Sequence, residues 1–123
     1  MKFYRCKKCG QIVAKIEEKP CTPFCCGEEM EYLPGNTTDA AVEKHVPVVE
    51  ESEGKTLVKV GAAPHPMLEA HHIAWLYVEL EDGGILKYLD VDKPAEALFD
   101  VDISKVKAVY EYCNLHGLWK KEL

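Results

Sequence analysis

Both ends of the chain contain residues whose types and spacing are those of metal ligands. Near the C-terminus, the stretch EYCNLHGLW (111–119) places the thiol of Cys113 and the imidazole of His116 three positions apart. Asn114 and Gly117 favour a turn there, which would let both side chains reach the same ion. Two ligands do not complete a metal site, so the remainder of the chain must supply the others.

Three further histidines stand where predicted loops meet predicted strands. His45 lies in EKHVP, His65 lies in PHPM, and His71 ends the loop before the apolar run IAWLYV. The prolines on either side of His65 restrict the backbone φ angle and favour an extended segment. With the thiol and imidazole near the C-terminus, these histidines make five potential ligands.

Four cysteines near the N-terminus form a second potential site. Cys6 and Cys9 make a C-x2-C pair followed by glycine, and the adjacent Cys25 and Cys26 are also followed by glycine. A glycine in that position allows a tight knuckle whose backbone N–H groups face the sulfur atoms. Four thiolates in a tetrahedron suit iron or zinc, and the spacing leaves both open. A module of roughly 35 residues buries too little apolar surface to fold alone, so the metal must contribute folding free energy.

Charge and hydropathy narrow the classes of partner. The 123 residues carry a net charge of −6, and no basic stretch is interleaved with aromatic residues, which argues against nucleic acid as a partner. The longest apolar run, IAWLYV, is far short of the roughly 20 residues that span a bilayer, so we expect no membrane insertion. Six cysteines without a recognisable signal peptide favour metal ligation in a reducing compartment over disulfides. We therefore expect a cytoplasmic protein.

The cysteines also divide the chain. Five of the six lie within the first 26 residues, and the turn-rich stretch LPGNTT (33–38) follows them. We therefore predict two domains, a metal-knuckle module at 1–36 and a second domain at 37–123.

The second domain has the pattern of short β-strands separated by turns. Apolar alternation predicts two strands around the Glu53-Gly54 turn and a hairpin closed by Asp82-Gly83-Gly84, whereas weak helical periodicity occurs only near 38–44 and 66–72. Seven short strands favour a mainly β fold, an antiparallel β-sandwich of the immunoglobulin type. The predicted strands cover 46–52, 55–61, 73–80, 85–91, 96–102, 105–112 and 117–123.

The motifs resemble those of one family along the whole chain. CKKCGQIV with CCGEEM resembles desulforedoxin, a small mononuclear-iron domain, whose four cysteines correspond to Cys6, Cys9, Cys25 and Cys26. Cys21, in PCTP, has no counterpart in that motif. EKHVP, HPMLEAH followed by IAW, and CNLHGLW match the order and spacing of the superoxide reductase signature. The complete chain therefore resembles desulfoferrodoxin, the two-iron form of superoxide reductase.

That resemblance implies two mononuclear iron sites, one of them held by the four N-terminal cysteines. The other iron would lie in a square plane of imidazoles, with the thiolate of Cys113 as axial ligand and one octahedral position open. His72 falls where the family has no ligand, and Trp75 and Trp119 are interpreted as core residues. The four equatorial ligands would be His45, His65, His71 and His116.

The resemblance also implies the reaction and its partners. Superoxide would gain one electron and two protons and leave as hydrogen peroxide while ferrous iron becomes ferric. Lys44 would attract the anion to an otherwise acidic protein, and Glu43 would be the sixth ligand of the oxidised resting state. A rubredoxin-type protein would donate electrons, and the small first module would pack against a second subunit in a homodimer.

Two other interpretations fit parts of the sequence. A cupredoxin-like electron carrier also has a cysteine and a histidine near its C-terminus, but all three methionines precede Cys113, and HPMLEAH would have no role. A zinc-stabilised binding module would use the same cysteines and leave the histidines incidental. Iron content together with superoxide-dependent peroxide formation separates both from a superoxide reductase.

Overall fold

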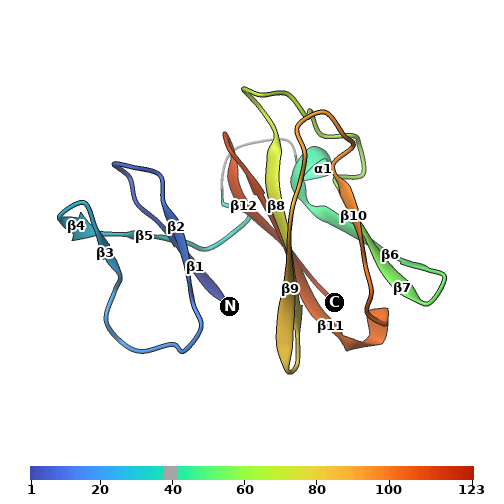
Figure 1. The fold of residues 1–123 in the computed structure, drawn as a ribbon, viewed down its shortest axis with the longest axis horizontal. Helices are drawn as coiled ribbons and strands as arrows, with labels where there is room; N and C mark the ends of the chain where they lie inside the picture. The colour runs from blue at the N-terminus through green and yellow to red at the C-terminus, as the bar shows by residue number, and fades with distance from the viewer. Residues whose placement is uncertain (38–41) are drawn as a thin grey trace. The chain divides into compact units, whose positions relative to one another are not determined.

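The computed structural model describes residues 1–37 and 42–123, and within them the chain forms two compact units. The first unit is Met1–Pro34 and the second is Gly35–Leu123. This division lies next to the boundary that the sequence predicts after residue 36. Each unit has its own sheets and its own core (Figure 1).

The first unit is a small β knuckle. Strands β2 (Ile12–Lys15), β1 (Lys2–Arg5) and β5 (Glu31–Leu33) form an antiparallel sheet in that order. Two very short strands, β3 (Phe24–Cys25) and β4 (Glu28–Glu29), make a separate hairpin. Its buried cluster consists only of Tyr4, Cys6 and Met30, with Val13 and Cys25 packed against it.

The second unit contains two antiparallel sheets. One has the order β10-β7-β6 and the other has the order β12-β11-β8-β9. The prediction of seven strands after a cysteine knuckle is therefore confirmed, and a short helix α1 (Val42–His45) and a 3-10 turn η1 (Ile103–Lys105) join them. The seven strands are β6 (Pro47–Ser52), β7 (Lys55–Val60), β8 (Ile73–Leu80), β9 (Gly83–Tyr88), β10 (Glu96–Phe99), β11 (Val106–Cys113) and β12 (Gly117–Glu122).

Strand alternation builds the core between these sheets. In β7, Thr56, Val58 and Val60 are buried while the residues between them are partly exposed. Successive side chains of a strand point to opposite faces, so this pattern turns one face of β7 inward. Burying one such aliphatic side chain contributes about 1.5–3 kcal/mol relative to leaving it exposed. The core cluster also includes Ile73, Leu76, Val78, Phe99, Val106, Val109 and Cys113.

Two hairpin turns differ in how well the sequence predicts them. Glu53 and Gly54 have φ angles of 50° and 79° and close the β6–β7 hairpin as predicted. The predicted β8–β9 hairpin is confirmed, but its turn is Glu81-Asp82 instead of Asp82-Gly83-Gly84. The two glycines lie inside β9, where a Cβ at Gly84 would overlap the ring of Tyr77 and a Cβ at Gly83 would meet open space.

The two weak helical patterns also have different outcomes. The pattern near 38–44 partly overlaps α1, and residues 38–41 lie outside the described residues. The pattern near 66–72 was wrong as a helix. Leu68 and His71 instead exchange backbone hydrogen bonds of 2.9 and 3.1 Å, which close a tight loop before β8.

The loops that matter for chemistry gather at one end of the sandwich. Helix α1, the loop between β7 and β8, and the β11–β12 turn all lie at the end opposite the β8–β9 turn (Figure 1).

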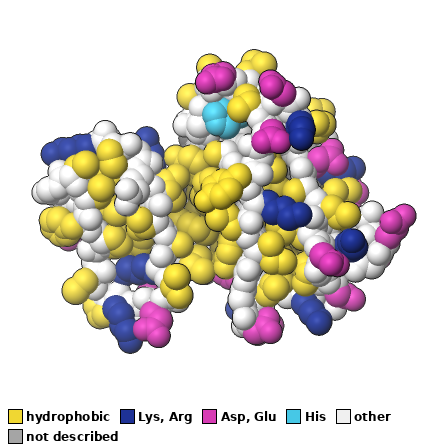
Figure 2. Space-filling model, viewed as in Figure 1, with side chains coloured by type: hydrophobic (Ala, Val, Ile, Leu, Met, Phe, Trp, Pro, Cys, Tyr) yellow, Lys and Arg dark blue, Asp and Glu magenta, His cyan; other side chains and the backbone are white. Residues whose placement is uncertain are grey.

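On the face in Figure 2, basic side chains are scattered among acidic and hydrophobic ones. Among the described residues, no helix combines the length and the apolar character that crossing a bilayer requires.

Candidate metal centres

Five side chains from three loops converge at that end of the sandwich. His45 ends α1, Cys113 ends β11, and His116 lies in the turn before β12. His65 and His71 come from the loop between β7 and β8. One donor atom from each of the five lies within 4.8 Å of every other. The structure therefore brings together the whole predicted set of four histidines and one cysteine.

The four imidazoles are arranged around a closed ring of contacts. His45 and His65 have ring centroids 4.7 Å apart, as do His65 and His71. The ring closes through His71–His116 at 5.1 Å and His116–His45 at 4.8 Å. Each neighbouring pair meets edge to face, with interplanar angles between 77° and 87°. This cyclic order is the one that four equatorial ligands of one ion require.

The donor nitrogens have the spacing of metal ligands. The Nε2 atom of His45 lies 3.1 Å from Nε2 of His65 and 3.0 Å from Nδ1 of His116. Two nitrogens bound at a right angle, each with a bond of about 2.1 Å, are separated by about 3.0 Å. Nε2 of His71 is buried and has no hydrogen-bond partner among the described residues. A metal ion would satisfy that orphaned atom.

The surroundings of His65 prepare it for metal binding. Its Nδ1 lies 2.7 Å from the carbonyl oxygen of Pro66, to which it donates, so Nε2 keeps a lone pair directed at the site. Burial lowers the pKa of His65 to about 4, and burial also lowers the pKa of His71. Both rings are therefore neutral at physiological pH, which is the form that binds a metal.

Cys113 is fully buried at the bottom of the site. Its sulfur lies 3.8 Å from Nδ1 of His116. Burial raises the pKa of the Cys113 thiol, whereas the backbone N–H groups of His116 and Leu115 stabilise the thiolate and lower it. A bound cation would tip that balance to the thiolate, because a coordinating thiol is deprotonated outright.

Trp119 contacts the site more closely than a core residue would need to. Its ring stacks on His45 with centroids 4.8 Å apart and planes 24° from parallel. Its Nε1–H donates to the carbonyl oxygen of His116 at 3.1 Å. Trp119 therefore holds two ligands in place as well as filling the core. Trp75 instead stacks on Tyr112 at 5.6 Å, with planes 6° apart, as expected of a packing residue.

Glu111 is a buried carboxyl group that sequence reasoning missed. It is 0% exposed, and neither of its oxygens has a hydrogen-bond partner among the described residues. Burial raises its pKa well above the ordinary value, which favours the neutral acid. Strand alternation could have predicted that Glu111 is buried, because Val109, Glu111 and Cys113 share one face of β11.

Glu43 and Lys44 directly precede a residue of the histidine–cysteine cluster, but neither belongs to the cluster. Both are exposed residues of α1 immediately before His45. Glu43 is absent from the group of converging donor atoms found among the described residues. Burial lowers the pKa of His71, and Lys44 is among the neighbouring positive charges that lower it further. Lys44 makes the smallest of these contributions, so its charge acts only weakly on the site.

The four N-terminal cysteines converge in the first unit. Their sulfur atoms all lie within 4.8 Å of one another, with 3.6 Å between Cys9 and Cys25 and 3.9 Å between Cys25 and Cys26. A tetrahedron of metal–sulfur bonds of about 2.3 Å separates its sulfurs by about 3.8 Å. The donor set and its spacing therefore fit one tetrahedral ion. Exposed Cys21 lies outside the cluster, as expected.

The backbone of this knuckle is arranged to stabilise the negative charge of a thiolate. The N–H of Cys9 points at the Cys6 sulfur at 3.4 Å, and Gly10, with a φ angle of 82°, donates to the carbonyl oxygen of Cys6 at 2.9 Å. The Cys9 N–H is the main reason that the pKa of Cys6 falls to about 6. Hydrogen bonding with the Cys9 thiol is the main reason that the pKa of Cys25 rises to about 12 without metal.

Comparison with known proteins places both units in one family. The family model described as desulfoferrodoxin matches residues 37–122, and the one described as desulfoferrodoxin, N-terminal domain, matches residues 1–33. The chain belongs to the desulfoferrodoxin family. The resemblance expected from the motifs is thereby confirmed. So is the prediction of two mononuclear iron sites, for which the four cysteines and the four histidines with Cys113 are the donor sets.

Individual relatives of this desulfoferrodoxin family member match either nearly its whole length or about two thirds of it. A desulfoferrodoxin from Desulfarculus baarsii is 42% identical over 122 residues, covering 99% of this chain and 96% of the relative. A superoxide reductase from Pyrococcus abyssi is 39% identical over 99 residues, covering 66% of this chain and 86% of the relative. The crystal structure of the superoxide reductase from Treponema pallidum superposes with a TM-score of 0.80 at 35% identity, covering 98% of both chains.

Asn114 joins two ligand-bearing loops of the desulfoferrodoxin fold. Its side-chain amide donates to the carbonyl oxygen of Ala70 at 3.0 Å, and its side-chain oxygen accepts from the N–H of His72 at 2.8 Å. These two bonds bracket the ligand His71 and tie it to the turn that carries Cys113. We expect Asn114→Ala to release iron from the histidine site roughly 10-fold faster, because outer-shell partners orient ligands. Iron transfer to a chelator, followed by absorbance, measures this rate.

Asn36 provides a matched control for that change. Its side chain makes the same two kinds of bond to the backbone of Lys120, at 2.9 and 2.8 Å, but touches no ligand-bearing loop. Asn36→Ala should lower the free energy of unfolding at least as much, because it loses two hydrogen bonds worth about 1–3 kcal/mol and also places alanine at a φ angle of 55°, yet it should leave iron release unchanged. Equal release rates in the two variants would show that Asn114 acts only through stability.

Proposed function

We propose that this protein is a superoxide reductase. Superoxide gains one electron and two protons at the histidine–cysteine site and leaves as hydrogen peroxide. The observation that carries the proposal is the ring of four imidazoles around a buried cysteine thiol, on segments at one end of a β-sandwich. Relatives named superoxide reductase support it.

The donor set suits iron better than zinc. Five protein ligands exceed the four that a zinc site usually takes, whereas ferrous iron held by them would supply one electron and could still accept a small anion. The protein positions the five donor groups and keeps them in the form that binds a metal. Burial keeps His65 neutral, the Pro66 carbonyl fixes its tautomer, and the Leu115 and His116 N–H groups support negative charge on Cys113.

Lys44 and Glu43 are proposed to act on the substrate side of the site. The chain carries a net charge of −6, so a small anion is repelled unless a local positive charge draws it in. Lys44 is exposed, precedes a ligand and contributes positive potential at His71, so it has the placement needed for steering. Glu43, one residue earlier on α1, is proposed as the further residue that would hold the iron in its oxidised state.

The partners belong to the same proposal. A rubredoxin-type protein donates the electron, and two copies of the chain form a homodimer through the small first unit. The location is cytoplasmic, where thiols of the four-cysteine site stay reduced. Neither nucleic acid nor a membrane takes part, in keeping with the net negative charge.

Stoichiometry tests the activity directly. The iron-loaded protein, kept reduced by a chemical reductant, should form one hydrogen peroxide for each superoxide consumed and release no oxygen. Dismutation would give half as much peroxide together with oxygen. A protein that binds two zinc ions and remains inactive after loading with iron would support the binding-module alternative, and an intense blue copper band would support the electron carrier.

Lys44→Ala should slow the reaction with superoxide by roughly 10-fold at low ionic strength and flatten its dependence on salt. The reason is that the steering charge is lost while the ligands remain. Lys107→Ala is the matched control, because Lys107 is also exposed and its loss changes the net charge equally. It lies six residues from Cys113 along β11, roughly 20 Å away. Pulse-generated superoxide measures both rate constants, and equal salt dependence in the two variants would remove Lys44 from this role.

A further inference from the structure

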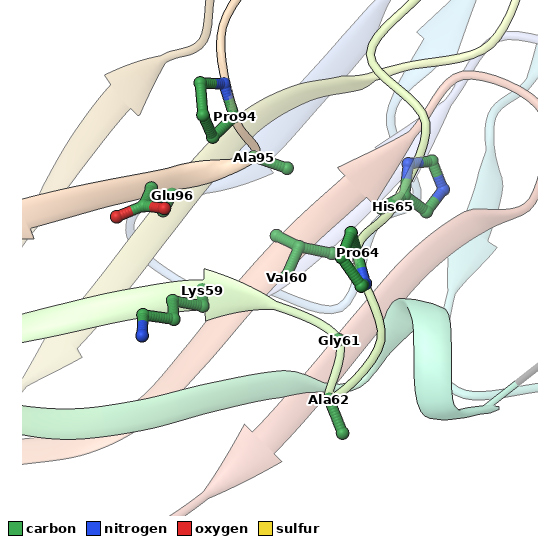
Figure 3. Close-up of a pocket in the computed structure, with 9 residues that line it drawn as sticks. All are labelled: Lys59, Val60, Gly61, Ala62, Pro64, His65, Pro94, Ala95 and Glu96. Carbon is green, nitrogen blue, oxygen red and sulfur yellow. The ribbon is translucent and has the colours of Figure 1, made fainter.

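Gly61 begins the loop that leads from the end of β7 to the ligand His65 (Figure 3). Its φ angle is 80°, in the left-handed region that favours glycine. A Cβ at this position would lie 2.6 Å from the carbonyl carbon and oxygen of Lys44 and 2.6 Å from the carbonyl oxygen of Ala63. These are backbone atoms, so no side-chain rotation could relieve the overlap. The loop approaches the Lys44 backbone this closely only because residue 61 is glycine.

A hydrogen bond holds the same two segments together. The N–H of Ala63 donates to the carbonyl oxygen of Glu43 at 2.9 Å. Glu43 and Lys44 directly precede the ligand His45 in α1, and Ala63 lies two residues before the ligand His65. The contact therefore joins the segments that deliver two ligands, whose Nε2 atoms are 3.1 Å apart.

The remainder of the 61–65 loop is packed less tightly against neighbouring residues. It borders a pocket that is also lined by Val60, Pro94 and Ala95 (Figure 3). A loop surface that faces such a space lacks the packed side chains that fix atoms elsewhere in a protein interior. The backbone contact with Glu43 and Lys44 is therefore the restraint that a side chain at residue 61 would disturb first.

We propose that Gly61 is a positioning residue for the histidine–cysteine site. Its missing side chain lets the 61–65 loop lie against the backbone of Glu43 and Lys44. That contact sets the spacing of His45 and His65 and places the Glu43 and Lys44 side chains beside the site. The roles of those two side chains rest on the proposed function, whereas the spacing of the ligands does not.

Gly54 makes a matched comparison possible. Its φ angle is 79°, so an alanine there meets the same unfavourable backbone conformation as at Gly61. Apart from its chain neighbours, no atom of the described residues lies within 4 Å of a Cβ at Gly54, and Gly54 and the ligand His45 lie at opposite ends of β6. Gly54→Ala therefore reproduces the conformational cost of Gly61→Ala without the overlap with Lys44.

The experiment uses the full chain loaded with iron and oxidised. We expect Gly61→Ala to shift the thiolate-to-iron absorption band of the histidine–cysteine site and to release its iron to a chelator roughly 10-fold faster. Gly54→Ala should leave both properties as in the unmodified chain. In superoxide kinetics, Gly61→Ala should also flatten the salt dependence, as Lys44→Ala does. A role limited to fold stability would change the melting temperature of both variants and move neither the band nor the release rate.

A second pair of variants keeps the test decisive if Gly61→Ala folds poorly. Gly61→Asn and Gly54→Asn relieve most of the backbone penalty, because asparagine tolerates positive φ, yet only the first keeps the overlap. A folded Gly61 variant with the band and release rate of its Gly54 partner would overturn the proposal. Failure of both Gly61 variants to fold would overturn it too, because Gly61 would then serve the sandwich as a whole. The band and release measurements need no superoxide, so an inactive protein would reject the proposed function and leave this inference to be decided separately.

Discussion

Replacing Cys113 with serine should remove the thiolate-to-iron band of the oxidised histidine–cysteine site, leave the absorption of the four-cysteine site, and reduce the rate of superoxide reduction by more than about 100-fold. Losing a partner outside the ligand set already costs roughly 10–100-fold in metal affinity or activity, and Cys113 is itself a member of the converging donor set. A serine hydroxyl is a poor replacement, because it neither ionises at neutral pH nor donates electron density as a thiolate does. In haem enzymes, a thiolate ligand similarly pushes electron density towards bound oxygen.

Cys21→Ser is the matched control for that experiment. Cys21 is exposed and lies outside both donor clusters of the described residues. The same sulfur-to-oxygen change there should leave the absorption spectrum, the iron content and the rate unchanged. An oxidised spectrum of Cys113→Ser identical to that of the unmodified chain would mean that all of the thiolate absorption comes from the four-cysteine site. The reactive iron would then lack the sulfur ligand on which the proposed function depends.

The ligands were predictable because each lies at a chain position that the sequence marks clearly. Cys113 and Gly117 are paired residues at the end of the β11–β12 hairpin, so the motif between them must turn and bring His116 back beside the sulfur. The prolines around His65 likewise mark an extended loop. Motif spacing therefore identifies the donors, since the chemistry depends on where strands end.

The arrangement of those donors could not be read from the sequence. The order of the imidazoles around the ring, and the use of Nδ1 by His116 where His45 and His65 present Nε2, depend on how the two sheets pack. The contacts of Trp119 with the site were likewise not predictable from the sequence. Strand alternation places it on a buried face, but its stacking on His45 joins residues that are far apart in the chain.

Other features were missed because a local pattern has several possible causes. A glycine after a strand, such as Gly61, predicts a turn whether or not another backbone approaches it. The run Asp82-Gly83-Gly84 also predicts a turn, yet Gly84 is needed inside β9 because the Tyr77 ring covers it. The seven strands themselves were predictable from alternation, whereas the sheet orders β10-β7-β6 and β12-β11-β8-β9 were not, since many pairings bury the same faces.

Cys6→Ser should unfold the first unit and leave the second intact. Cys6 is 1% exposed and belongs to a buried cluster of only three side chains. Three such side chains contribute about 5–9 kcal/mol, whereas metal binding to four cysteines or histidines in small domains contributes about 10–16 kcal/mol. Without the metal, the first unit cannot offset the conformational entropy of its chain.

Limited proteolysis of the iron-loaded protein measures this effect. We expect cleavage within residues 1–34 and a resistant product that keeps the histidine–cysteine absorption band, because the second unit has its own core. Cys21→Ser controls for the loss of a thiol from the same unit and should resist cleavage as the unmodified chain does. Loss of the histidine–cysteine band in Cys6→Ser would contradict the expectation, because it would mean that the sandwich needs the folded knuckle to hold its own iron. If the band persists, the four-cysteine metal stabilises its own unit and the second iron depends on the sandwich alone.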